Sequence, residues 1–497
     1  MPAVHGYLRR LLTTTAAYQV GDVVSKLFAV ALLPVYTRHV STSQYGVAEL
    51  LMTGIVLVSI LVRLGIGEAF VRYHFDDEDR ARQDALARRS VGFLLVATTL
   101  CAIPLALLAD PLSKLVLGFH DAGVFRIAVL GLWAFTNLEL AYALLRVDER
   151  VRTYLYASVT NVLATIGLTV WLVVLRDEQA RGLLLGNYAA STFVLLALWA
   201  SMWRRLRPRR GGATHPNLHP LRRLLGFGLP TVPADASVYA LNLVDRYYLF
   251  HRYGAATAGV YSIAVKLAGS VAFVVRAFQY SWPPLAYSIK DDAEAARFYA
   301  FVATYYLMVT GWAVAGLLLL GRWVTRLLAA PDFYGAHTAL PWLALGWALY
   351  GLFVIFVVIA GRAEVTTRNF PAAATGLAAN VLLLVVLTPS LGIAGAGLAL
   401  AGAYVVMLVV MRLLTRRLFH VAFEWWRIAQ LALVLGGGAA AGELLLPTSG
   451  AAGLLARLAL ALALPLGLAA TGFFRPDERA RLRALLVRLR PRRIAAP

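Results

Sequence analysis

The sequence is short of the residues on which most soluble proteins and enzymes depend. Only 15% of its 497 residues are charged, whereas about 25% is usual in soluble domains. It has one cysteine, Cys101, which excludes an intramolecular disulfide and argues against a metal site. There is no zinc-ligand spacing, no Walker loop and no nucleophile motif in a suitable context. We therefore expect a protein that is not an enzyme and that needs neither a cofactor nor a metal.

Long apolar runs are what the sequence does have. Apolar residues make up 60% of the chain and the mean hydropathy is +0.70, as in a protein with many membrane spans. Runs of about 20 apolar residues mark membrane helices. They predict an all-α polytopic membrane protein with fourteen spans, near residues 11–37, 45–72, 88–109, 123–146, 153–175, 181–203, 222–250, 256–288, 296–320, 338–361, 369–388, 392–414, 426–446 and 452–474.

The first span does not have the pattern that we expect of a secretory signal peptide. It carries Asp22 and Lys26 and continues to Leu33 without a small-residue cleavage site. No connection between spans is long enough for a soluble domain, and residues 76–89 read as a solvated loop.

Basic residues are spread unevenly over the connections. With the N-terminus in the cytoplasm, 33 of the 47 Lys and Arg residues fall in cytoplasmic segments and 7 in outer loops. This asymmetry predicts that both termini are cytoplasmic. It also explains the net charge of +21 without a nucleic-acid partner. In the tail, residues 476–497, leucines share one helical face between arginines, which suits an amphipathic helix on an anionic inner leaflet.

Ionisable residues lie inside several predicted spans. Asp235, Lys266 and Arg276 fall in the seventh and eighth spans. A charge in the hydrocarbon costs about 2.5–3.5 kcal/mol by insertion scales, so it normally faces a cavity or a partner. This helix pair is where we expect the functional site.

The first two spans repeat this pair. An ungapped shift of 213 positions places Gly46 on Gly259, and it brings Asp22 onto Asp235 and Arg63 onto Arg276. Lys26 and Lys266 do not coincide under this shift. Internal repeats with a binding site near the membrane midplane are typical of transporters. We therefore expect alternating access around a fixed site.

Several short motifs recur in the order and spacing of a known family. They are Leu33–Pro34 through Tyr45–Gly46, Gly228–Leu229–Pro230, Asp245–Arg246, Gly259–Ser262, Trp282–Pro284 and Leu391–Ala396. Together they resemble the polysaccharide-transporter family, of the O-antigen-flippase type, in the multidrug/oligosaccharidyl-lipid/polysaccharide flippase superfamily. The resemblance covers nearly the whole chain.

The resemblance implies two pseudo-symmetric six-helix lobes in a V, followed by two further helices. Its parts would be an N-lobe at 1–205, a basic linker at 206–221, a C-lobe at 222–420, helices 13 and 14 at 421–475, and the tail at 476–497. It also implies a flippase that moves polyprenyl-pyrophosphate-linked oligosaccharide to the outer leaflet of the bacterial plasma membrane, for cell-surface polysaccharide. Its partners would be that lipid-linked glycan, the bilayer, and glycosyltransferases and a polymerase of the same pathway. The protein would be a monomer.

The embedded charges fit this substrate on chemical grounds. Guanidinium offers phosphate a planar fork of donors, and ammonium offers a point charge. We therefore expect Arg63, Arg276, Lys26 and Lys266 to bind the pyrophosphate. Asp22 and Asp235 would orient these bases, bind sugar hydroxyls or carry a coupled proton. The alternative is a set of inter-lobe salt bridges without substrate contact.

Other assignments stay open at this stage. Asp245 and Arg246, near the outer end of the seventh span, suit an outer gate or a helix-end pair. Within the same superfamily, a lipid II flippase shares the need for a cationic cavity. A cation-coupled multidrug exporter would favour acidic or aromatic cavities instead.

Overall fold

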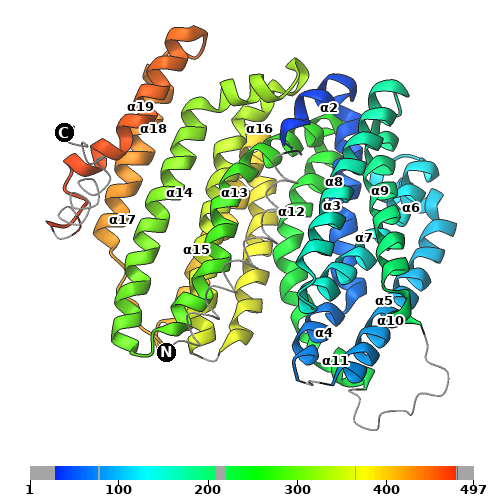
Figure 1. The fold of residues 1–497 in the computed structure, drawn as a ribbon. Coiled ribbons are helices and arrows are strands. Elements are labelled where there is room, and N and C mark those ends of the chain that lie inside the picture. The colour runs from blue at the N-terminus through cyan, green and yellow to red at the C-terminus, as the bar shows by residue number, and fades with distance from the viewer. Residues whose placement is uncertain are drawn as a thin grey trace, which may run out of the picture. The chain divides into compact units, whose positions relative to one another are not determined.

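The computed structural model describes residues 28, 30–76, 79–207, 220–363, 365–476 and 478. Every regular element in these ranges is a helix, which confirms the predicted all-α class. Most helices are long, and within each unit they lie roughly side by side (Figure 1). Asp22, Lys26, the linker residues 208–219 and nearly all of the tail lie outside the described residues.

Eleven helices in the described part are long and apolar enough to cross a membrane. One of these, α16 (Asn369–Thr415), holds two predicted spans, because Gly392 interrupts it with φ 56° and ψ −136°. A further helix, α12 (Val232–Tyr253), has the length of a span, and its charged residues lower its hydropathy. The predicted first span falls mainly on residues that are not described. The structure is thus consistent with fourteen spans.

The chain forms two compact units. Unit 1 comprises residues 1–267, 325–339 and 367–410, and unit 2 comprises 268–324, 340–366 and 411–497. Unit 1 therefore contains helices from both predicted lobes. Where the lobes divide remains a prediction.

Unit 1 holds the helices from α2 to α12. Their bounds are α2 (Leu33–His39), α3 (Thr42–Arg63), α4 (Ile66–His74), α5 (Arg80–Leu107), α6 (Ala109–Leu117), α7 (Ala122–Val147), α8 (Val151–Val170), η1 (Trp171–Leu175), α9 (Gln179–Ser201), α10 (Trp203–Leu206), α11 (Leu221–Gly228), η2 (Leu229–Thr231) and α12. It also holds the start of α13 (Ala255–Ser288), η3 (Pro331–Thr338) and most of α16.

Two predicted elements of unit 1 need correction. The span 222–250 is two helices, α11 and α12, joined by the short turn η2 at Gly228–Leu229–Pro230. A proline lacks the N–H that a helix interior requires, and Pro230 and Pro233 are the second residues of η2 and α12, where that N–H has no partner within the helix. The predicted loop 76–89 is also wrong. From Arg80 onward it is the start of α5, which Asp79 caps by accepting a hydrogen bond from the N–H of Ala81 at 3.0 Å.

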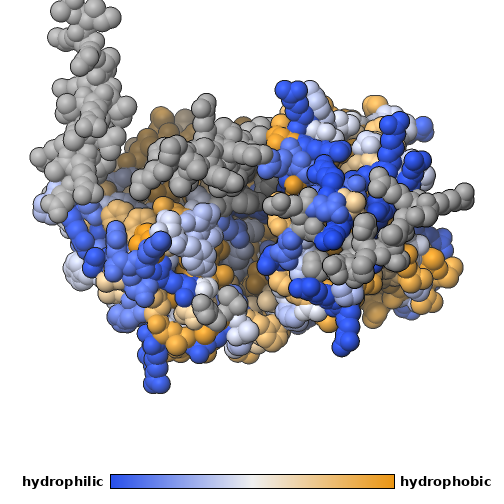
Figure 2. Space-filling model, turned by 60° about the horizontal axis from the view of Figure 1, so that its bottom comes forward, coloured by the Kyte–Doolittle hydropathy of each residue, from blue (hydrophilic) through white to orange (hydrophobic). Residues whose placement is uncertain are grey.

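A buried ion cluster joins the ends of the helices at one end of unit 1. Arg205 donates to Asp84 at 2.7 Å and also pairs with the fully buried side chain of Asp148. His74, 3% exposed, packs against Phe70 in the same region. Hydrophilic side chains gather on the face that carries α4, α10 and α11 (Figure 2). This is the predicted cytoplasmic end, where the cluster fixes the helix ends relative to one another.

Unit 2 holds most of α13 and the helices α14 (Asp292–Leu328), α15 (Leu340–Arg362), α17 (Trp425–Leu431), η5 (Ala432–Gly437), α18 (Gly438–Leu445) and α19 (Gly450–Ala470), with η4 (Thr366–Arg368) at its border. Arg457 on α19 is fully buried and pairs with Glu443, which also pairs with Arg322 on α14 at 2.9 Å. Breaking a buried pair leaves an uncompensated charge, so this network holds the last helices against α14.

Candidate functional site

The second predicted span is broken where its embedded arginine stands. Arg63 is the last residue of α3, and α4 begins at Ile66. Between them Leu64 and Gly65 both have left-handed backbones, with φ 49° and 69°. A Cβ atom on Gly65 would lie 2.2 Å from the carbonyl oxygen of Gly228, and one on Gly228 would lie 2.2 Å from that of Gly65. The Gly–Leu–Pro motif therefore supplies the residue against which this break packs.

A cavity of about 560 Å³ opens beside this break. We call it the Arg63 cavity. Apolar side chains form much of its wall, among them Ile66, Leu94, Leu140 and Phe227. Its charged lining residues are Arg63, Glu68, Arg72, Glu139 and Arg146. Charged groups therefore converge on an otherwise apolar pocket, as is usual for a ligand site.

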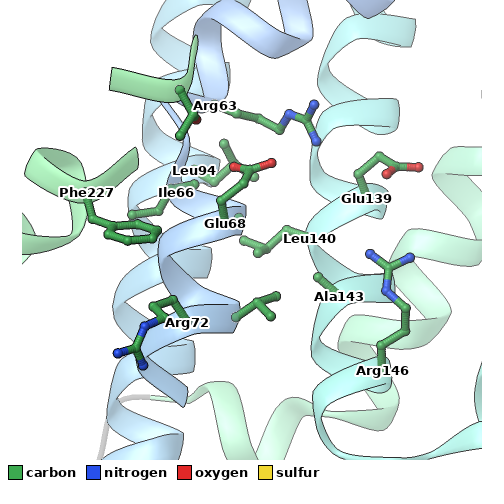
Figure 3. A pocket seen from close by; sticks show the side chains of 13 residues that line it. Arg63, Ile66, Glu68, Arg72, Leu94, Glu139, Leu140, Ala143, Arg146 and Phe227 are labelled. Carbon is green, nitrogen blue, oxygen red and sulfur yellow. The ribbon is translucent and has the colours of Figure 1, made fainter. Parts of the chain in front are cut away.

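Four of these charged side chains face the cavity from two sides. Arg63 and Glu68 extend from the break in the second span, and Glu139 and Arg146 extend from α7 (Figure 3). No ion pair joins any of the four within the described residues, whereas Arg72 pairs with Asp76. The guanidinium of Arg63 is thus not held by a salt bridge in the described part of the chain. It can offer its donors to a ligand in the cavity.

One predicted residue lies close to Arg63. Asp235, on the first turns of α12, is exposed and lies within electrostatic range of both Arg63 and Glu68. The structure thus brings together one base and one acid of the predicted site. Arg276 is exposed on the part of α13 that belongs to unit 2.

Lys266 lies in a different environment. Its ammonium pairs with Glu49 on α3 at 2.5 Å and lies 5.1 Å from the centre of the Tyr45 ring. The side chain of Glu49 is 8% exposed. Because an adjacent carboxylate neutralises Lys266, this lysine matches the salt-bridge alternative better than the cationic site.

Asp245 and Arg246 are buried, with 1% and 6% of their surfaces exposed. Asp245 accepts a hydrogen bond from the hydroxyl of Tyr261 at 2.7 Å. Arg246 donates to the hydroxyl of Ser262 at 3.1 Å. Both contacts join α12 to α13, and the predicted role of these residues as a gate remains a prediction.

The glycines on which the repeat was aligned contact one another. A Cβ atom on Gly46 would lie 2.0 Å from the carbonyl oxygen of Ala255. A Cβ atom on Gly259 would lie 2.0 Å from the carbonyl oxygen of Thr42. The 213-residue shift that places Gly46 on Gly259 also places Thr42 on Ala255, so it exchanges the two contacts. Locally, α3 and α13 therefore pack with pseudo-two-fold symmetry.

Sequence reasoning assigned no role at the site to Glu49, Glu68, Glu139 or Arg146. Glu49 falls inside a predicted span, so the rule that selected Lys266 could have selected it as well. Glu139 was equally visible, since it also lies within a predicted span. Nothing in the sequence showed that Arg146 turns back into a cavity from the end of α7.

Comparison with known proteins identifies the family to which the chain belongs. The model of the family described as polysaccharide biosynthesis protein matches residues 11–284, which is more than half of the chain. The chain belongs to this family. A curated relative, Lsg locus putative protein 1 of Haemophilus influenzae, is 23% identical over 286 residues. That alignment covers 56% of this chain and 66% of the relative, just under two thirds of its length.

Solved structures share the fold of this polysaccharide biosynthesis protein. The lipid II flippase MurJ in an inward closed conformation superposes with a TM-score of 0.72 at 14% identity, covering 93% of this chain and 99% of that one. A multidrug resistance MATE family transporter in an inward-facing conformation gives 0.64 at 15% identity, with coverages of 80% and 96%. The Vibrio cholerae MATE transporter VcmN in its bent form gives 0.53 at 14% identity, with coverages of 84% and 99%. The chain is thus a multi-pass membrane protein of polysaccharide biosynthesis with the MurJ and MATE fold.

Proposed function

We propose that this protein is a flippase that moves polyprenyl-pyrophosphate-linked oligosaccharide across the bacterial plasma membrane. The glycan would pass from the cytoplasmic to the outer leaflet by alternating access, for the assembly of cell-surface polysaccharide. Both termini would lie in the cytoplasm. The family supports a role in polysaccharide biosynthesis, and the fold is one that is found in transporters.

The observation that carries the proposal is Arg63, a guanidinium without a salt bridge in the described part of the chain, facing a cavity of about 560 Å³. Pyrophosphate is an anion that cannot cross hydrocarbon unaided. Arginine binds phosphate oxygens through paired, charge-assisted hydrogen bonds. Glu68 and Glu139 add acceptors for sugar hydroxyls beside it. Arg276 and Lys26 remain predicted contributors to the same function.

The proposal can be tested in vesicles that contain the purified protein and a fluorescent polyprenyl-pyrophosphate-linked glycan. A membrane-impermeant quencher reports which leaflet holds the lipid. Loss of a hydrogen bond to a charged group costs about 1.5–3 kcal/mol, so Arg63→Ala should slow flipping about tenfold to a hundredfold. Arg63→Lys should recover part of the rate, because it retains the charge without the planar fork.

The matched control is Arg126→Ala. Arg126 lies on α7, the helix that carries Glu139 and Arg146, and it donates to the carbonyl oxygen of Ala106 at 3.4 Å. It does not line the Arg63 cavity. Its replacement should leave the rate unchanged. A normal rate for Arg63→Ala, with the protein correctly folded, would contradict the proposal.

Lipid II is the second candidate substrate, because the chain shares the fold of a lipid II flippase. The same vesicles can be loaded with fluorescent lipid II. Movement of lipid II without movement of the oligosaccharide lipid would favour this candidate. A multidrug exporter would instead carry organic cations, which Arg63 and Arg146 would repel and Glu68 and Glu139 would attract. A fluorescent organic cation in the same vesicles tests this alternative.

A further inference from the structure

A second cavity, of about 310 Å³, lies in unit 1 and shares no lining residue with the Arg63 cavity. We call it the Asn161 cavity. The helices α2, α3, α8 and α9 and the start of α13 contribute to its wall. Its polar lining residues are Tyr36, Tyr45, Glu49, Asn161, Thr165, Thr169, Asn187 and Lys266. So polar a wall inside a membrane protein marks a place where a polar ligand or water is held.

Among the described residues of this wall, the charges cancel. Lys266 and Glu49, which pair at 2.5 Å, are its only charged lining residues in the described part of the chain. The ring of Tyr45 adds a second contact to the ammonium. A pyrophosphate would have to compete with Glu49 for Lys266. The described part of the wall therefore suits an uncharged ligand.

The remaining polar groups are amides and hydroxyls, which can both donate and accept hydrogen bonds. Three of them have no hydrogen-bond partner in the described part of the chain, and the hydroxyls of Tyr45 and Thr169 are two of these. The carboxamide oxygen of Asn161 is shielded from solvent and accepts no hydrogen bond within the described residues. Buried polar atoms are nearly always satisfied, so a turn of the Asn161 side chain toward the cavity would let an occupant supply a donor to this oxygen.

The size and aromatic content of the cavity limit the kinds of ligand that can fit it. Its volume equals that of about ten water molecules in the liquid, and it lies at the lower end of the usual range for ligand pockets. Phe28 and Tyr36 add aromatic surface to the wall. One compact ring with several hydroxyl groups fits these properties. An extended chain or a lipid tail does not.

The two cavities lie at different heights along α3. Glu49 lines the Asn161 cavity and Arg63, fourteen positions later, lines the Arg63 cavity. At a rise of about 1.5 Å per residue, the two positions are about 21 Å apart along the helix. A ring held in the Asn161 cavity is therefore well separated from an anion held by Arg63.

We propose that the Asn161 cavity binds one uncharged sugar ring of the glycan, away from the pyrophosphate and with Asn161 accepting a sugar hydroxyl. The sugar as ligand class rests on the proposed function. The site adds selectivity for the glycan, whereas Arg63 recognises an anion that all polyprenyl-pyrophosphate lipids share.

Binding of two free probes to the purified protein in detergent tests this proposal. The probes are a tetrasaccharide of neutral hexoses and inorganic pyrophosphate, each measured by equilibrium dialysis. Asn161→Leu should weaken tetrasaccharide binding about fivefold, the value of one net hydrogen bond, and leave pyrophosphate binding unchanged. Arg63→Ala should weaken pyrophosphate binding and leave tetrasaccharide binding unchanged. Asn187→Leu, a substitution on α9, should also weaken tetrasaccharide binding and leave pyrophosphate binding unchanged.

Folding is controlled by a thermal unfolding curve for each variant. Asn161→Leu should not lower the melting temperature, because its carboxamide oxygen accepts no hydrogen bond within the described residues. The matched control is Asn137→Leu. Asn137 donates to Thr98 at 2.9 Å and to the carbonyl oxygen of Trp133 at 2.8 Å, and it lines neither cavity. Its replacement should lower the melting temperature and leave the ratio of the two affinities unchanged.

Unchanged tetrasaccharide binding by folded Asn161→Leu and Asn187→Leu would overturn the proposal, as would a wild-type protein that binds no tetrasaccharide. Pyrophosphate binding that survives Arg63→Ala would instead count against the proposed function. It would leave the result for the sugar site standing. The two failures are therefore distinguishable.

Discussion

The two ends of α3 pack closely against other helices in the same way, but they differ in whether their charged side chains are paired. At each end a glycine contacts a glycine of a later helix, Gly46 with Gly259 and Gly65 with Gly228. Near Gly46 the embedded charges Glu49 and Lys266 are paired. Near Gly65 the guanidinium of Arg63 has no ion pair among the described residues. Close helix packing thus recurs at both ends, whereas a charge left open to a ligand occurs at one.

The contrast teaches that an embedded charge does not by itself mark a binding site. Lys266 and Arg63 both met the sequence criterion of an ionisable group inside a span. The structure separates them through their neighbours, since a carboxylate neutralises one and apolar cavity walls surround much of the other. If this difference is functional, changes at the two ends of α3 should affect stability and flipping differently.

A cross-link at the Gly46 end should have the largest effect. Cysteines at Thr42 and Ala255, in a Cys101→Ala background, can be joined by a short thiol cross-linker. If alternating access separates α3 from α13 at this end, flipping should stop completely and return when the link is cleaved. Flipping at the normal rate in a fully cross-linked sample would contradict the mechanism.

Substitutions of the contact glycines should come next. Gly65→Val combines overpacking, which costs about 1–3 kcal/mol, with left-handed strain of about 1–2 kcal/mol. Gly46→Val meets only the overpacking, because its backbone is helical. The melting temperature of Gly65→Val should therefore be lower than that of Gly46→Val. The control is Gly54→Ala, also on α3, where an added Cβ meets no atom within 4 Å; this variant should be neutral or stabilising.

Breaking the charge pair should have a smaller effect. Glu49→Gln leaves the ammonium of Lys266 unpaired. We expect the free energy of unfolding to fall by about 2 kcal/mol. This is less than the ~3–5 kcal/mol for breaking a fully buried pair, because solvent still reaches part of Lys266. Glu49→Gln/Lys266→Met should regain most of this stability. At the other end, Arg63→Gln should change flipping far more than the melting temperature. A fall in stability as large as that of Glu49→Gln would remove the distinction between the two ends.

The pH dependence of His74 should be the smallest effect. Burial lowers the pKa of His74 from its ordinary value of 6.5, although Asp148 opposes this shift. The folded state therefore binds fewer protons than the unfolded state below that value. The stability that depends on a neutral His74 is fully present above about pH 6.5 and is lost as the pH falls. His74→Phe should reduce the fall in melting temperature on acidification. An identical pH profile in the variant would show that His74 does not contribute.

Composition and periodicity were sufficient for the class of protein and for most of its helices. Apolar runs of about 20 residues have few physical alternatives to membrane helices, because backbone groups in lipid must bond within their own segment. The repeat was also visible in the sequence, and the reciprocal contacts of Gly46 and Gly259 agree with it. The break after Arg63 was not visible, since Leu64 gives no sign of a left-handed backbone.

The sequence by itself determined that this chain is a multi-pass membrane protein with ionisable groups inside its spans. Those properties depend on residue type and on local order along the chain. Only the tertiary structure decided which charges are neutralised and which face a cavity. Glu49 and Lys266 are far apart in sequence, as are Arg63 and Glu139, and the energy of a charge depends on the distance to its partner. The helices set those distances when they pack.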